Sequence, residues 1–173
     1  MQGIALWNNY NKSGKSFLKL GNYADAERMF TEALKVAEEL GPRDPHLCVS
    51  LVNLARVLQA MGKADEAEVH LNRALLIAET ERGTDHIDVA AIANALAGLY
   101  QAEGKLADAE PFFKRALQIM EKVLGPEHTG LATVLENYAS CLQQMGRKDE
   151  AGDIEGRAMA IRNQAAKDAK PKP

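Results

Sequence analysis

A glycine-anchored pattern that recurs every 41 or 42 residues is the strongest constraint on how this chain folds. In each copy an alanine follows the glycine at five and at twelve positions, and valine or isoleucine follows at fifteen. Self-similarity at a fixed period of tens of residues indicates stacked supersecondary units, so we expect a repeat array. The anchoring glycines are Gly21, Gly62, Gly104 and Gly146.

Each copy contains two segments with apolar residues at helical spacing, joined at the glycine. Proline-containing loops such as Gly41-Pro42-Arg43-Asp44-Pro45 separate the copies, because proline cannot continue a helix. One such helix pair cannot bury its apolar stripe alone, and stacking neighbours would form a continuous core. We expect helices at 3–20, 23–40, 46–61, 64–82, 88–103, 106–124, 130–145 and about 148–165.

Two further expectations concern single glycines, Gly21 and Gly14. Gly21 should end the first helix in a left-handed conformation, which glycine tolerates. Gly14, inside that helix, costs about 1 kcal/mol relative to alanine. We therefore expect another helix backbone to approach it closely.

The pattern resembles the tetratricopeptide repeat. The resemblance rests on glycine, alanine five on, an aromatic residue or leucine nine on, alanine twelve on, and a preceding Asn-Leu-Ala (53–55). The usual period is 34 residues; here the longer period, with Leu-Gly-Pro-Glu-His at 124–128, resembles the kinesin-light-chain type. It covers about residues 5–165 and implies an all-α fold, a right-handed superhelical solenoid of four antiparallel helical hairpins. The expected units are about 5–44, 45–86, 87–128 and 129–165, in one array over 1–165.

The last unit departs from the pattern. Glu155 stands where the other units have phenylalanine or leucine, and Gly152 and Gly156 weaken the helix. Terminal repeats are expected to be atypical, so a capping role is favoured. The alternative is a dimer contact along the small residues Gly152, Gly156 and Ala160. Residues 166–173 are expected to form a basic, disordered tail.

The charge distribution argues against nucleic acid as a ligand. Residues 1–24 and 162–173 each carry a net charge of +3, and the whole chain carries −3, so the residues between them carry −9. Nucleic acid binding needs a concentrated basic face. Cys48 and Cys141 follow no metal or redox spacing and are expected to be buried thiols. With no signal peptide or membrane-spanning run evident, we expect a cytoplasmic protein without membrane insertion.

No catalytic constellation, phosphate loop or metal motif is evident, so the chain is expected to be no enzyme and to use no cofactor or metal. His86 and His128 lie at matching loop positions, where Asp44 stands in the first unit. A role at helix starts is favoured over metal binding. Asp65 and Glu66 are expected in the first turn of a helix, where they favour the helix dipole.

The resemblance implies that the first helix of each hairpin lines a concave groove that binds a peptide. A stripe at helical spacing carries asparagine in every unit, and asparagine can pair with a peptide backbone of any sequence. One end of this stripe carries basic residues and no acidic ones, which favours an acidic ligand. The expected groove residues are Asn11, Lys12, Lys15, Lys19, Asn53, Arg56, Asn94, Gln101 and Asn137.

Two further observations limit the partner. The basic and asparagine clamp that family members use for chaperone tails is incomplete, because Ala91 and Ala95 stand where basic residues are needed. The small residues Ala91, Ala95, Gly98 and Ala102 leave room for a bulky apolar side chain. The expected function is a protein-interaction scaffold for an acidic peptide with an apolar anchor. The alternatives are self-assembly as a homodimer through the last unit, or a merely solvated helix face.

Overall fold

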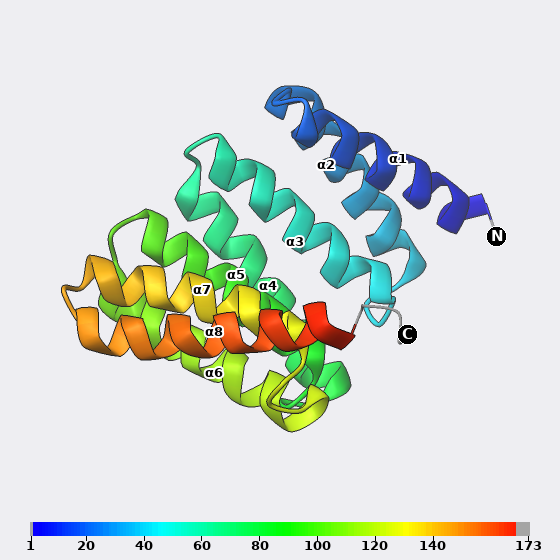
Figure 1. The fold of residues 1–173 in the computed structure, drawn as a ribbon. Helices are drawn as coiled ribbons and strands as arrows, with labels where there is room; N and C mark the ends of the chain where they lie inside the picture. The colour runs from blue at the N-terminus through cyan, green and yellow to red at the C-terminus, as the bar shows by residue number, and fades with distance from the viewer. Residues whose placement is uncertain (1, 169–173) are drawn as a thin grey trace. The chain divides into compact units, whose positions relative to one another are not determined.

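The computed structural model describes residues 2–168, and all regular elements within that range are helices (Figure 1). They follow one another without a strand between them, and each expected helix is present within about one residue of its expected start. The helices are α1 (Gln2–Lys19), α2 (Tyr23–Leu40), α3 (Pro45–Ala60), α4 (Ala64–Arg82), α5 (Ile87–Ala102), α6 (Leu106–Leu124), α7 (Thr129–Gln144) and α8 (Lys148–Asp168).

The chain divides into two compact units, one ending at Thr84 and the other beginning at Asp85. In the first unit α1 pairs with α2 and α3 with α4, and α2 packs against α3. In the second unit α5 pairs with α6 and α7 with α8, and α6 packs against α7. Each unit is therefore two helical hairpins joined through the second helix of one and the first helix of the next.

The repeated positions form the cores of both units. The alanines five and twelve residues after each anchoring glycine are at most 1% exposed. Phe30 and Phe113, nine residues after their glycines, are fully buried, whereas Glu155 at the same position is only half-buried. Glu155 accepts a hydrogen bond from Gln143 at 2.5 Å, so a polar contact replaces an aromatic one in the last hairpin.

The close neighbour of Gly14 is a side chain, which corrects the expectation of an approaching backbone. A Cβ atom added at Gly14 would lie 2.7 Å from Cε1 of Phe30. Since Phe30 is fully buried, its ring is enclosed by other residues and does not extend into solvent. Gly14 thus makes room within the first hairpin for the aromatic side chain of α2.

Turn glycines and capping side chains set the helix ends. Gly21 has a φ of 74°, the left-handed value expected for it. His86 and His128 accept hydrogen bonds through Nδ1 from the backbone N–H groups of Asp88 and Gly130, at 3.2 and 3.0 Å. Asp44 accepts the equivalent bond from the N–H of His46 at 2.8 Å. The helix-start role is confirmed, and an aspartate fills it in the first unit.

The end of the chain differs slightly from the expectation. Helix α8 continues to Asp168, three residues beyond its expected end, and Gln164 donates a hydrogen bond to Asp168. Residues 169–173, most of the expected tail, lie outside the described residues. Between residues 2 and 168 no helix is long and apolar enough to cross a membrane.

Both cysteines are buried free thiols, as expected. The Sγ atom of Cys48 lies 3.8 Å from the Ala74 carbonyl oxygen, and that of Cys141 lies 3.9 Å from the Leu106 carbonyl oxygen. Burial raises the pKa of both thiols. They therefore remain protonated and pack as small apolar groups.

Candidate functional site

The most distinctive surface lies in the first unit, where α1 and α3 run side by side in the same direction (Figure 1). Trp7 donates from its indole Nε1 to Ser50 Oγ at 2.7 Å. One turn further along both helices, Asn53 Nδ2 donates to Asn11 Oδ1 at 2.8 Å. These two bonds fix the register, so that each residue of α1 lies beside the residue of α3 about 42 or 43 positions later.

Asn11 and Asn53 are engaged with each other. They are 8% and 6% exposed, and their amides form the buried bond just described. This pairing holds α1 to α3 and leaves only part of each amide for another molecule. The sequence placed both residues on one stripe, but it contained no signal that they bond to each other.

The predicted basic residues of this unit are exposed beside the asparagine pair. A cavity of about 470 Å³ lies along α1 and is lined by Asn8, Asn11, Lys12, Lys15, Ser16 and Lys19. On α3 the exposed Arg56 lies one turn beyond Asn53. The structure thus brings together six of the nine predicted site residues.

These four cations have no partner, unlike the basic residues around them. The side chains of Lys12, Lys15, Lys19 and Arg56 form no hydrogen bond or ion pair with any residue between 2 and 168. Five other basic side chains of the same unit each form an ion pair with a carboxylate. Those pairs are Arg28–Asp25, Lys35–Glu32, Arg43–Glu81, Lys63–Glu27 and Arg73–Glu38, at 2.6 to 3.3 Å.

The three remaining predicted residues lie in the second unit, on α5 and α7. Gln101 donates to Ser140 Oγ at 3.1 Å, a bond between these two helices. Asn94 is half-buried, and its Oδ1 atom is buried without a hydrogen-bond partner. Asn137, at the position equivalent to Asn53, is exposed, so the amide pair of the first unit does not recur here.

The polar stripe of α7 is largely tied to α8. Glu136 accepts two hydrogen bonds from Arg162, at 2.5 and 2.7 Å, which lower the pKa of the carboxyl group. Nearby on α5, a Cβ added at Gly98 would meet nothing within 4 Å, and Ala91 and Ala102 are exposed. The expected open patch of small residues is therefore present in the second unit, without a free cation beside it on the stripes of α5 and α7.

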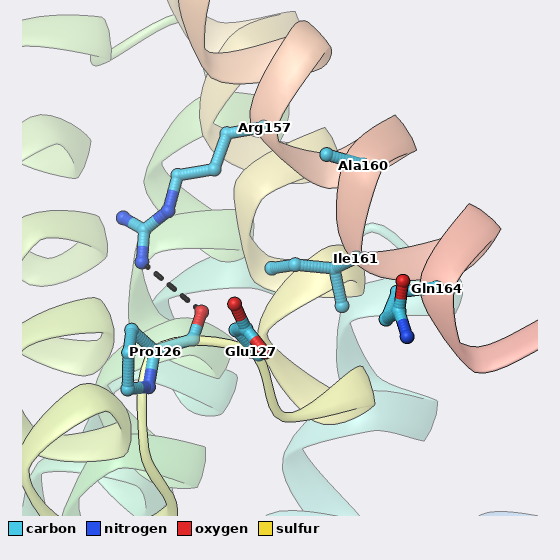
Figure 2. Close-up of a pocket in the computed structure, with 6 residues that line it drawn as sticks. All are labelled: Pro126, Glu127, Arg157, Ala160, Ile161 and Gln164. Carbon is cyan, nitrogen blue, oxygen red and sulfur yellow. Dashed lines mark hydrogen bonds between the residues drawn. The ribbon is translucent and has the colours of Figure 1, made fainter. Parts of the chain in front are cut away.

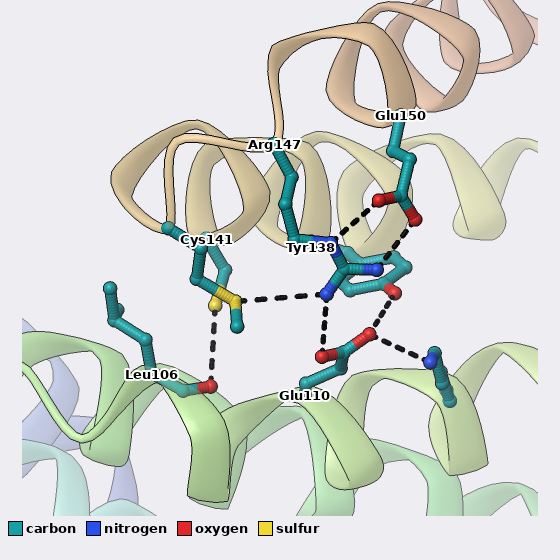
Figure 3. A network of polar contacts seen from close by, with 8 residues as sticks. Leu106, Glu110, Tyr138, Cys141, Arg147 and Glu150 are labelled. Carbon is teal, nitrogen blue, oxygen red and sulfur yellow. Dashed lines mark hydrogen bonds and ion pairs between the residues drawn. The ribbon is translucent and has the colours of Figure 1, made fainter.

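A polar network joins the two hairpins of the second unit (Figure 3). Glu110 of α6 accepts hydrogen bonds from the Tyr138 hydroxyl at 2.9 Å and from Arg147 at 2.7 Å, and it pairs with Lys114 at 2.7 Å. Hydrogen bonds from Lys114 and Arg147 lower the pKa of Glu110 to about 2. Arg147 also binds Glu150 through two hydrogen bonds. No sequence pattern indicated this network, whose members come from α6, α7, α8 and, for Arg147, the turn between α7 and α8.

The same two ion pairs couple hairpins in both units. A glutamate six residues after one anchoring glycine pairs with the basic residue just after the next glycine, as in Glu110–Arg147. A glutamate seventeen residues after a glycine pairs with arginine eleven after the next. The pairs are Glu27–Lys63 and Glu38–Arg73 in the first unit, and Glu110–Arg147 and Glu121–Arg157 in the second.

On α8 the two glutamate positions are occupied by Gly152 and Asn163. A hairpin stacked on this face would lack both carboxylates. The second helices of the other hairpins carry glutamate at both positions, so α8 differs from them in lacking these two ion-pairing residues. The capping interpretation of the last hairpin stays a prediction.

A second cavity, of about 410 Å³, lies between α8 and the loop before α7 (Figure 2). Pro126, Glu127, Arg157, Ala160, Ile161 and Gln164 line it. Arg157 extends from α8 toward the loop, donates to the Pro126 carbonyl oxygen at 3.4 Å and pairs with Glu121 at 2.6 Å. The guanidinium of Arg157 is already paired. This cavity therefore offers a ligand a weaker positive charge than the α1 cavity does.

Among residues 2–168 no cluster of three or more His, Cys, Asp or Glu side chains could hold a metal ion. His70 of α4 has a buried Nδ1 atom without a partner, and burial lowers its pKa. Asp65 and Glu66 lie in the first turn of α4, as expected.

Comparison with known proteins now decides the family. The family model for the tetratricopeptide repeat matches residues 5–80, 46–109 and 88–164. The chain belongs to the tetratricopeptide-repeat family. Repeats of this family generally mediate protein–protein interactions. Human tetratricopeptide repeat protein 19, mitochondrial, is 32% identical over 77 residues, which are 44% of this chain. The matched region spans 20% of the length of that relative.

Solved structures of the family share the fold. BtubC (BKLC) from P. vanneervenii superposes with a TM-score of 0.84 and 22% identity, over 99% of this chain and 68% of that one. A putative kinesin light chain from Podosopora anserina superposes with a TM-score of 0.72 and 23% identity, over 92% of this chain and 76% of that one. PilF of Pseudomonas aeruginosa superposes with a TM-score of 0.71 and 17% identity, over 93% of this chain and 63% of that one. The expected fold class, the tetratricopeptide-like α-α superhelix, is confirmed, and its neighbours include the kinesin-light-chain type.

Proposed function

We propose that this chain is a protein-interaction module whose first unit binds an acidic segment of a partner protein on the face formed by α1 and α3. The observation that carries the proposal is the set of four unpaired cations beside the α1 cavity. The other exposed basic side chains around them are neutralised by carboxylates of the same chain. An exposed cation cluster without internal counter-charges is complementary to an acidic ligand.

Each cation contributes little to the free energy of binding, but the four contribute significantly together. An exposed ion pair contributes about 0.2–1 kcal/mol, so four such pairs give selectivity for acidic ligands and a clear salt dependence. The unused hydrogen-bonding capacity of Asn11 and Asn53 lies beside the cations and suits a peptide backbone. A peptide lying on this face would meet both kinds of group.

The proposed partner is a protein rather than nucleic acid, because the chain as a whole carries a net charge of −3. We also propose a non-enzymatic role, in keeping with a family whose members generally bind other proteins. A cytoplasmic location is part of the proposal and is tested by fractionation of the producing cell. Asn94, Gln101 and Asn137 are proposed as peptide-contacting residues of the second unit, taken by itself.

The experiment is a peptide-library screen on the wild-type protein and on a Lys12→Glu, Lys15→Glu, Arg56→Glu variant, at low and high salt. We expect acidic peptides to be enriched by the wild type at low salt and to be lost both in the variant and at high salt. Enrichment that is indifferent to charge reversal would place the binding surface elsewhere. No enrichment of acidic peptides would contradict the proposal.

The second candidate is self-assembly through α8, and one observation favours it. Cβ atoms added at Gly152 or Gly156 would meet nothing within 4 Å, and Met159 beside them is 63% exposed. Another helix could therefore approach this face closely. The candidate predicts a mass that rises with concentration and that Gly156→Glu holds at the monomer value. A monomeric mass throughout the micromolar range would contradict it.

A further inference from the structure

We infer that His70 makes the first unit sensitive to mild acid: protonation of its imidazole weakens the packing of α4 and lowers the stability of that unit. The inference concerns the stability of the fold and is independent of the proposed peptide site. It uses a buried titratable group that neither candidate function involves.

The Nδ1 atom of His70 lacks the contact that every other histidine of the chain makes. Among the described residues this atom is buried and has no hydrogen-bond partner. The Nδ1 atoms of His46, His86 and His128 bond to Asp44 Oδ1, to the N–H of Asp88 and to the N–H of Gly130. Protonation would add an N–H group at Nδ1 of His70, and a buried donor without an acceptor is unfavourable.

The repeat shows that His70 occupies an apolar position. The residues eight after the other anchoring glycines are all half-buried and apolar: Met29, Phe112 and Ile154. In the second unit the ring of Phe112 lies 5.6 Å from that of Tyr100, on the first helix of the same hairpin. The residue of α3 equivalent to Tyr100 is Leu58, which is 2% exposed. A charged imidazole is therefore unfavourable in this place.

The charged groups around His70 do not compensate for its burial. Burial lowers the pKa of His70 and Arg73 lowers it further, whereas Glu66 of α4 and Glu38 of α2 oppose this shift. Glu38 already pairs with Arg73 at 2.7 Å. Helix α3, which packs against α4, has no carboxylate, and its ionisable residues are His46, Cys48 and Arg56. The imidazole is thus held neutral in the folded unit.

The direction of the pH effect follows from this lowered pKa. The unfolded chain binds the proton more readily than the folded one does, so the stability from His70 is fully present above the usual pKa of 6.5. It is lost as the pH falls below that value. In the second unit the pKa of Glu110 is about 2, so its network stays ionised in mild acid. Mild acid therefore acts on the first unit and spares this network.

The test follows unfolding through Trp7, the single tryptophan of the chain, which is buried in the first unit. Urea unfolding is measured from Trp7 emission at about pH 7.5 and about pH 5.5, on either side of the usual histidine pKa. The variants are His70→Phe, which introduces the residue found at position 112, and His128→Asp as the matched control in the second unit.

Between these two pH values, we expect the unfolding constant of the wild type to rise at least about threefold more than that of His70→Phe. His128→Asp should keep the pH dependence of the wild type. Equal pH dependence in the wild type and His70→Phe would overturn the inference.

A second measurement needs no stable variant. NMR follows the ring protons of the four histidines with pH, and His70→Phe serves only to assign one signal. The His70 signal should titrate with a midpoint below the usual 6.5. A midpoint at or above that value would contradict the inference and leave the proposed peptide site unaffected.

Discussion

Gly14 and Gly98 both occupy helix interiors, in opposite surroundings. At Gly14 an added methyl group would overlap the buried ring of Phe30, whereas at Gly98 it would meet nothing within 4 Å. Alanine is favoured over glycine in a helix by about 1 kcal/mol. The same substitution should therefore have opposite effects at the two positions.

We expect Gly14→Ala to lower the free energy of unfolding by about 1–2 kcal/mol, because overpacking against Phe30 exceeds the gain in helix propensity. Gly98→Ala, the matched control, should raise it by up to about 1 kcal/mol. Urea unfolding of both variants measures the difference. A rise in the free energy of unfolding for Gly14→Ala would show that the Phe30 ring does not require a glycine at position 14.

At the scale of single helices, three loops cap the start of the following helix with different residues. Asp44, His86 and His128 each accept a hydrogen bond from the backbone N–H two residues on. The departure of the first repeat from the pattern thus preserves the cap. Aspartate and histidine should be exchangeable here, and alanine should not replace either.

His128→Asp should leave the unfolding midpoint unchanged or slightly higher, since aspartate caps helices well and favours the helix dipole. His128→Ala should cost about 0.5–1 kcal/mol, because the N–H of Gly130 loses its acceptor. Thermal unfolding of the pair measures the effect. Equal losses in the two variants would argue that the imidazole acts through packing.

The junction between α6 and the last hairpin depends on one ionised carboxylate. Partner cations lower the pKa of Glu110 to about 2 in the folded state, below its usual value of 4.5. The folded state is therefore stabilised by this group above pH 4.5. That contribution is lost as the pH falls from about 4.5 to 2.

We expect Glu110→Gln to reduce the free energy of unfolding by about 1–2 kcal/mol at pH 7, a modest loss because Lys114 is 60% exposed and water screens its pair. The difference from the wild type should shrink as the pH falls through this window. Unfolding measured at pH 7, 4.5 and 3 would show it. A difference that is constant with pH would mean that Glu110 acts by packing rather than by charge.

At the scale of the whole molecule, the sequence predicted the helices well, whereas the peptide site stays a prediction. Period and turn glycines are local signals, and they located the hairpins, the core alanines and the capping histidines. Helical spacing also put Lys12, Lys15 and Lys19 on one face of α1, and repeat equivalence put Arg56 on the matching face of α3. The Asn11–Asn53 bond and the Glu110 network were not predicted, since they join residues 28 to 42 positions apart whose distances depend on how hairpins pack.

The central claim is that the unpaired cations of α1 and α3 bind acidic peptides, and an affinity measurement with a charge-matched control tests it most directly. The dissociation constant of a glutamate-rich peptide is measured for the wild type, for Lys12→Glu, Lys15→Glu, Arg56→Glu, and for Arg28→Glu, Lys35→Glu, Arg43→Glu. The two triple variants change the net charge of the same unit equally.

We predict that reversal of the unpaired cations weakens binding at least tenfold, since three exposed ion pairs contribute about 0.2–1 kcal/mol each and reversal adds repulsion. Reversal of the partnered cations should change the dissociation constant by less than twofold. Equal losses in the two variants would mean that overall charge attracts the peptide without a defined site. Unchanged affinity in both would contradict the claim.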